Sequence, residues 1–134
     1  SGLGQQAMPL VNGSAGDDLH EIKKADLVVL FQKVEKVFGG YEWTYTVANA
    51  MPNPAHNVVV TKGFKYVNTG GAPTALAAPL TQNLGSLQGY EVRGVKIVTT
   101  GGTPQHYCVG TSLSAKTSTP EMISTNNSAS HSFQ

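Results

Sequence analysis

The chain has 134 residues, enough for one domain with a buried core, and its formal net charge at pH 7 is +1. A charge so close to neutral gives no electrostatic reason to expect nucleic acid or an anionic membrane as a partner. Charged residues form only 13% of the chain, about half the share expected of soluble domains. Such a surface, rich in Thr, Ser, Asn and Gly, is more typical of extracellular or assembled proteins than of cytosolic enzymes.

The single cysteine, Cys108, excludes an internal disulfide framework and any zinc site built from several cysteines. No apolar run approaches the roughly 20 residues that a helix needs to cross a bilayer. No stretch has the pattern of a signal peptide. We therefore expect no insertion into a membrane.

Residues 1–24 are predicted to form an N-terminal arm ahead of a domain that spans residues 25–134. Most of the arm, Ser1–Leu19, is polar, rich in glycine and without a hydrophobic period, as flexible segments are. Ordering such a segment costs conformational entropy, which its few apolar side chains offset only by docking onto a surface. That surface is either the arm's own domain or a neighbouring subunit, and both alternatives stay open.

Asp26–Val34 is the first predicted strand, because Val28–Phe31 groups β-branched and aromatic residues together. A helix over Leu19–Phe38 is the alternative, since His20–Lys24 has helical character. The pair Gly39–Gly40 then breaks the chain before the next element. We favour the strand.

Tyr41–Thr61 combines two predicted strands with a proline-rich turn and carries the chain's only tryptophan. Along Tyr41–Ala48, the residues of one face are aromatic or β-branched, and this period of two is typical of a half-buried strand. Pro52 and Pro54 remove backbone donors and end that strand, and Asn57–Thr61 begins another. We predict that the whole stretch forms a β-hairpin-like unit around which the core packs.

Phe64–Val67 either extends the preceding strand or forms a short edge strand. Asn68–Gly89 follows as a long uncharged connection, and loops of this length are uncommon unless they are functional or partly structured. Its leucines would be costly to leave in water, so they either cover an open edge of the core, which is the simpler interpretation, or meet a partner. They are Leu76, Leu80, Leu84 and Leu87.

Three more strands are predicted in the C-terminal part, over Tyr90–Thr100, Gln105–Ala115 and Asn126–Phe133. In the first of them the alternation shifts at Gly94, as a β-bulge would cause. Six or seven strands at intervals marked by turns, without a convincing helix, predict an all-β sandwich.

The sequence contains no convincing metal site. The four histidines, none of which has metal-ligand spacing on a predicted element, are His20, His56, His106 and His131. A blue-copper site would combine two histidines, a cysteine and a weak axial ligand such as methionine. His56, Cys108 and Met122 are available, but no histidine closely follows Cys108. We expect no metal and no cofactor.

A nucleophilic site is not predicted either. His106 neighbours Cys108 on the same strand face, but no acid is placed to orient its imidazole. We therefore interpret Cys108 as a small buried residue of a strand. Glu42, Glu91 and Glu121 show no pairing of carboxylates on a common element, and no glycine-rich phosphate loop is present. No catalytic residue is expected.

Several short motifs occur in a fixed order from Ala25 onward. They are Ala25-Asp26-Leu27, Tyr45–Asn49 (YTVAN) with Pro52 and Ala55 after it, Asn57–Thr61 (NVVVT), Leu84–Leu87 (LGSL) and Thr125–Ser130 (TNNSAS). In this order they resemble the conserved-repeat domain of bacterial and archaeal surface proteins, often called DUF11 or CARDB-like. The resemblance covers the chain from about residue 25 to its end.

This resemblance implies an immunoglobulin-like antiparallel β-sandwich of about seven strands, here with an extended N-terminal arm. It implies a non-enzymatic role in stalks, adhesins, surface layers or exterior modules of large assemblies, and it transfers no catalytic residue. The chain departs from the family at Met51, where a glycine is usual, and after Thr61, where the usual Asp and Leu-Pro pair are missing. The sequence also holds a single unit with an arm, whereas the family usually forms repeats.

We therefore expect a structural subunit of a filament, a surface layer or a virion exterior, extracellular or on the surface of a cell or virion. Its partners would be identical subunits or another structural protein, held by packing and by strand addition from the arm. The residues expected to make these contacts are Leu3, Met8, Leu10, Val11, Leu76, Leu80 and Leu84. The alternative is an adhesive or glycan-binding module, for which Tyr66 and Tyr90 are the candidate exposed aromatics.

Overall fold

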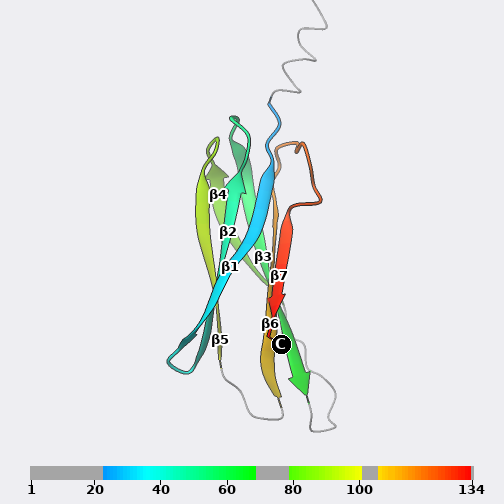
Figure 1. Cartoon of the computed structure of the whole chain (residues 1–134). Coiled ribbons are helices and arrows are strands. Elements are labelled where there is room, and N and C mark those ends of the chain that lie inside the picture. Colours follow the sequence, from blue (N-terminus) through cyan, green and yellow to red (C-terminus); the bar gives the residue numbers. More distant parts are fainter. Residues whose placement is uncertain (1–22, 69–78, 101–105, 134) are drawn as a thin grey trace, which may run out of the picture.

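The computed structural model describes residues 23–68, 79–100 and 106–133, and Figure 1 shows their strands in two packed layers. The strands are β1 (Leu27–Val37), β2 (Gly40–Asn49), β3 (Ala55–Asn68), β4 (Leu80–Leu87), β5 (Val92–Thr100), β6 (His106–Lys116) and β7 (Ser128–Ser132). None of the described residues is helical, so the alternative helix over Leu19–Phe38 is wrong from residue 23 onward. The rest of that range, and the arm up to residue 22, lie outside the described residues.

The strands form two antiparallel sheets, with the orders β1-β2-β5 and β4-β3-β6-β7. In the first sheet, β2 pairs with both neighbours along its length, so that Ala48 lies opposite both Val28 and Val92. In the second sheet, β3 pairs with β4 on one side and with β6 on the other. Seven strands in two antiparallel sheets confirm the predicted immunoglobulin-like sandwich.

The core contains the residues of β2 that the alternating pattern predicted to lie on its buried face. Trp43, Tyr45 and Val47 are fully buried, and each large apolar side chain removed from water stabilises the fold by about 1.5–3 kcal/mol. The indole N–H of Trp43 donates to Oγ1 of Thr99 at 3.0 Å, and the hydroxyl of Tyr45 donates to the carbonyl of Thr111 at 2.9 Å. Both buried polar atoms are thus paired, which joins β2 to β5 and to the opposite sheet.

The prediction of a β-hairpin over Tyr41–Thr61 is wrong, because β2 and β3 belong to different sheets. The chain crosses the end of the sandwich between them, and the buried side chain of Asn49 fixes this crossing. Its Oδ1 accepts from the backbone N–H of Asp26 at 3.3 Å and of Met51 at 3.2 Å, and its Nδ2 donates to the carbonyl of Asn53 at 2.6 Å. The prolines end the ladder as expected, but they lead the chain into the second sheet.

Two other expectations are corrected. Asn68–Gly89 is not a connection throughout, since β4 lies within it and ends on the fully buried Leu87. Gly94 does not mark a bulge, because the register of β2 and β5 runs through it without a shift, with Thr46 opposite. Phe64–Val67 extends β3, which was one of its two predicted alternatives. The remaining strands lie within a few residues of their predicted positions.

Candidate assembly surface

The outer face of the four-stranded sheet consists mainly of short side chains. In β6 the inward Leu113 and Ala115 are buried, so the residues that alternate with them face outward. The strand register then places the outward Ser112 between Gly63 of β3 and Ser130 of β7. Up to the register shift after Lys65, the other outward residues of these three strands are Val59, Thr61, Lys65, Gly110, Ser114, Lys116, Ser128 and Ser132. Beyond the shift, Val67 lies opposite Tyr107, which is 37% exposed.

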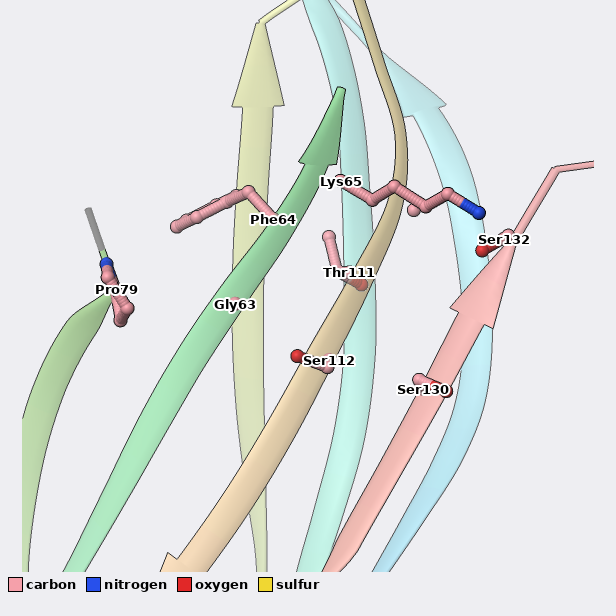
Figure 2. A pocket seen from close by; sticks show the side chains of 9 residues that line it. Gly63, Phe64, Lys65, Pro79, Thr111, Ser112, Ser130 and Ser132 are labelled. Carbon is pink, nitrogen blue, oxygen red and sulfur yellow. The ribbon is translucent and has the colours of Figure 1, made fainter. Parts of the chain in front are cut away.

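This face contains a hollow with a volume of about 510 Å³, which lies between Pro79 on one side and Ser132 on the other (Figure 2). Gly63 and Gly110 line the hollow without a side chain to fill it. A methyl group at Gly63 would collide with Oγ of Ser112, which leans over it. Glycine inside a strand often marks a place where another backbone comes close. Here the two glycines make room for serine side chains of the neighbouring strands, Ser112 beside Gly63 and Ser132 beside Gly110.

A second hollow, of about 450 Å³, lies beside Thr61, one outward position from Gly63 on the same strand. Lys116 lines this second hollow and Lys65 lines the first. No acidic residue of the described part lines either hollow. The two lysines thus give the hollows a positive charge, and no acidic residue that lines them neutralises it.

Two of the seven predicted contact residues fall in the described part of the chain. Leu80, at the start of β4, is 57% exposed, whereas Leu84 is partly buried against the core. Together with the buried Leu87, Leu84 covers the core beside β4, as the simpler interpretation of these leucines expected. The other five predicted contact residues lie outside the described residues. They are Leu3, Met8, Leu10, Val11 and Leu76.

Cys108 and His56 differ in their surroundings. Cys108 is only 5% exposed, and burial raises the pKa of its thiol, so the neutral form dominates at pH 7. This confirms its interpretation as a buried strand residue. His56 lies on the surface, with Nδ1 3.1 Å from Oγ of Ser86. Among the described residues, no group of three or more His, Cys, Asp and Glu could hold a metal ion.

The two candidate aromatics for a glycan differ in exposure. Tyr90 is 67% exposed and has a left-handed φ of 61°, which holds it in the turn before β5. Tyr66 is half-buried in β3.

Within the described ranges, no helix is long and apolar enough to cross a membrane.

The outward serines were not predicted as a surface, although the sequence contains a signal for them. Ser128, Ser130 and Ser132 occupy every second position of β7, and Ser112 and Ser114 do so in β6. Residues two apart in a strand share a face, so each row could have been assigned to one side of its strand. The alternation could not show that β6 and β7 are neighbours, which is what merges the two rows into one surface.

Comparison with protein-family models found no match, and no curated protein is similar enough in sequence to match. Among solved structures, the fold is similar to the CARDB domain of the Pyrococcus furiosus protein PF1109, solved in complex with di-metal ions. The TM-score is 0.55 at 18% identity, over 81% of this chain and 90% of that one. At this level of identity the likeness shows a CARDB-like fold and nothing further.

Two other solved structures match with TM-scores below 0.5. The trimeric lipoprotein SadB of Salmonella enterica gives a TM-score of 0.41 at 8% identity, over 77% of this chain and 66% of that one. The β-glucosidase DesR of Streptomyces venezuelae gives 0.42 at 14% identity, over 82% of this chain but only 15% of that one. The described chain is thus a β-sandwich of CARDB-like fold whose four-stranded sheet presents a hollowed face of short side chains.

Proposed function

We propose that the protein is a non-enzymatic structural subunit of a surface or extracellular assembly, in which subunits pack through the outer face of the β4-β3-β6-β7 sheet. The composition of that face carries the proposal. The short residues serine, threonine and glycine occupy most of its outward positions, with Lys65 and Lys116 as long exceptions. Fixing a long side chain such as Lys or Glu costs up to about 2 kcal/mol, whereas glycine costs nothing. This face can therefore be buried against another subunit at a low entropic cost.

The fold and the composition support a surface location. The CARDB-like fold agrees with the resemblance of the motifs to domains of prokaryotic surface proteins. The weakly charged chain, with 13% charged residues, agrees with a subunit that buries much of its surface in an assembly. A filament, a surface layer and a virion exterior all meet these conditions.

The N-terminal arm supplies the second contact of the proposal. Three of the eight acids, Asp17, Asp18 and Glu21, precede residue 23, whereas all nine Lys and Arg residues follow residue 22. Residues 1–22 therefore carry a formal charge of −3, and the remainder, with five acids, carries +4. Opposite charges favour association of the arm with a domain. Its apolar residues pack on the neighbour, or its backbone adds a strand to the neighbour's sheet.

The experiment that tests packing through the sheet fills the hollow. Ser112→Trp places a large side chain on the outer face of β6, and Thr44→Trp does the same on β2 of the opposite sheet, as the control. Sedimentation velocity of the wild-type chain over a range of concentrations should show oligomers or ordered polymers. We expect S112W to weaken association about ten-fold or more, and T44W to leave it near the wild-type value.

Deletion of residues 1–15 tests the arm. The truncated chain should lose assembly while its far-ultraviolet circular dichroism and its cooperative unfolding stay those of a folded domain. Normal assembly of this variant would remove the arm from the proposal. A wild-type chain that stays monomeric at every concentration would contradict the structural role itself, and an S112W variant that assembles normally would contradict the role of the sheet face.

Glycan binding is the second candidate, and the exposure of Tyr90 favours it. Sugar-binding sites stack the apolar face of a sugar ring on an exposed aromatic, with polar groups beside it. Tyr90 is 67% exposed, and Gln88 and Glu91 flank it in the same turn. Binding on a glycan array that Tyr90→Ala abolishes would support this function. An array without a hit would exclude it for the glycans present.

A further inference from the structure

Four strands lie at the edges of the two sheets: β1 and β5 in one, β4 and β7 in the other. An edge strand presents unpaired backbone N–H and C=O groups, which pair with another strand unless the edge is short, bulged, charged or covered. The four edges differ in how they are protected.

The edge of β1 is protected along most of its length. Near its start, the N–H of Val29 donates to the carbonyl of Asn126 at 3.0 Å, which covers the edge with the segment before β7. The register then shifts between Phe31 and Lys33, and such an irregularity turns an edge away from a partner strand. The exposed residues that follow this shift are charged: Lys33, Glu35 and Lys36.

The edges of β4 and β7 are protected in other ways. Arg93 of β5 donates to the carbonyl of Leu84 at 2.6 Å and to that of Ser86 at 3.4 Å, so two carbonyls of β4 are occupied. Gly85 between them has a left-handed φ of 74°, and the register of β3 and β4 shifts twice nearby. β7 has only five residues, too few to present a long edge.

Among the described edge strands, β5 has the fewest of these protections from Val95 to Thr100. Its register with β2 has no shift, and the strand contains no proline. Arg93 binds β4. Lys96 is the one charged residue from Val95 to Thr100; its side chain is 60% exposed, and its Nζ lies 3.2 Å from Oε1 of Glu42 on β2. Inward residues of this part of the strand are buried, so the edge is held in a fixed extended conformation. Its six residues span ~20 Å.

We infer that the free edge of β5, Val95–Thr100, accepts residues of the N-terminal segment 1–22 of a neighbouring copy as an additional strand. The inference rests on the proposed function, because it names the surface on which the arm acts. Segment 1–22 contains no Lys or Arg, so it would not place a like charge beside Lys96. Pairing two β5 strands would instead set like charges on adjacent strands, which is destabilising.

The length of the segment fits this role. Residues 1–16 contain no charged side chain, so they can pair with this edge without burying an unpaired charge of their own. Twenty-two extended residues reach up to ~75 Å. This is enough to cross to a neighbouring subunit and still pair with the ~20 Å edge.

The fixed position of the chain at residue 25 favours the edge of a neighbour over the chain's own edge. The N–H of Ala25 donates to the carbonyl of Pro120 at 2.8 Å, and the N–H of Met122 donates to the carbonyl of Ala25 at 2.9 Å. These bonds hold the start of the domain beside the connection of β6 and β7, and β2 separates β1 from β5 (Figure 1). The segment would have to cross the end of the sandwich to reach its own β5.

Val98→Lys and Leu30→Lys form a matched pair that tests the edge in the full chain. Val98 and Leu30 are 64% and 54% exposed on the edge strands of the same sheet, β5 and β1. Lysine on an edge strand disfavours strand addition. We expect V98K to raise the concentration at which assembly begins by about ten-fold, and L30K to change it by less than about two-fold. Equal effects, or none, would overturn the assignment to β5 and leave the proposed function standing.

Crosslinking gives a readout that does not depend on how V98K folds. Cys108 is buried, so single exposed thiols are introduced by Val98→Cys in one preparation and by Leu10→Cys, or by Cys at position 3, 8 or 11, in another. After mixing and oxidation with diamide, we expect disulfide-linked dimers of the two variants, identified by mass spectrometry, and none with Leu30→Cys. Assembled material whose arm crosslinks only to position 30, or to neither position, would overturn this inference alone. A chain that never assembles would overturn the proposed function and this inference with it.

Discussion

Nη1 of Arg93 in β5 donates to the backbone carbonyl of Leu84 in β4 at 2.6 Å, although these strands belong to different sheets. Nη2 of the same side chain binds Oε2 of Glu91 at 2.6 Å. The hydrogen bond from Arg93 lowers the pKa of the Glu91 carboxyl, which is therefore ionised at neutral pH and orients the guanidinium. The side chain of Arg93 thus links the two sheets on this side of the sandwich, where no backbone hydrogen bonds join β5 to β4.

Arg93→Met should lower the free energy of unfolding by about 1–2 kcal/mol, because it removes hydrogen bonds from a charged donor that is still partly exposed to solvent. Arg93→Lys keeps the positive charge, but the single ammonium group of lysine lacks the planar fork with which arginine binds two carbonyls and a carboxylate together. This variant should therefore recover less than half of the lost stability. Urea unfolding followed by the fluorescence of Trp43 measures both variants. Wild-type stability in R93M would show that the contact is not stabilising.

The fold could be predicted from the sequence where a strand is buried on one face. β2 alternates Trp43, Tyr45 and Val47 with polar residues, and all three are buried. A period of two records burial on one face, so it locates such strands directly. It does not record which strands are neighbours, because pairing is set by contacts far apart in the sequence. For that reason the crossing between the sheets at Asn49 was mistaken for a hairpin.

β4 and the assembly surface were hidden for related reasons. Along β4 only Leu87 is buried, and Gly85 interrupts the extended backbone with a left-handed φ, so the strand lacks a clear alternation. The outward serines show their alternation, but their joint surface depends on the register of Ser112 with Gly63 and Ser130. The protection of an edge strand depends on side chains from other strands, such as Arg93 over β4.

Gly40 and Gly94, on neighbouring strands, should respond oppositely to alanine. A Cβ at Gly40 would overlap the carbonyl oxygen of Thr99, a backbone atom that cannot move without breaking the ladder, whereas a Cβ at Gly94 would meet no atom within 4 Å. We expect Gly40→Ala to cost about 2–3 kcal/mol or more. Gly94→Ala should be neutral or stabilise by up to about 1 kcal/mol, because alanine restricts the unfolded chain. Thermal unfolding compares the two, and an equal loss of stability would contradict the open space at Gly94.

Asn49 should be the most sensitive polar residue of the core. Its Nδ2 faces the carbonyl oxygens of Asn53 at 2.6 Å, Gln88 at 3.3 Å and Leu87 at 3.4 Å. Asn49→Ala leaves these acceptors and two backbone N–H groups without their partner, at a cost of about 2–4 kcal/mol. Asn49→Asp should cost more at pH 7, because a buried carboxylate would face carbonyl oxygens.

The pH dependence of Asn49→Asp provides the control. Burial beside carbonyl oxygens raises the pKa of the introduced carboxyl in the folded state above its unfolded value of about 3.9. The folded state therefore binds the proton more tightly, and N49D should gain stability relative to N49A as the pH falls from 7 toward about 4. Urea unfolding at several pH values measures this difference. A constant difference would show that the carboxylate reaches solvent.

Alkaline pH should destabilise the fold through Tyr45 and Cys108. Burial raises the pKa of the Tyr45 hydroxyl above 10.0 and that of the Cys108 thiol above 9.0. Both groups stay protonated in the folded chain at pH values where the unfolded chain releases their protons. The stability is therefore complete below pH 9 and declines as the pH rises through the folded pKa values, by at most about 1.4 kcal/mol per pH unit for each group. Tyr45→Phe and Cys108→Ala should each flatten this decline, even where they lower stability at pH 7. Urea unfolding from pH 7 to pH 11 checks the slopes, and a wild-type slope in both variants would assign the decline to other groups.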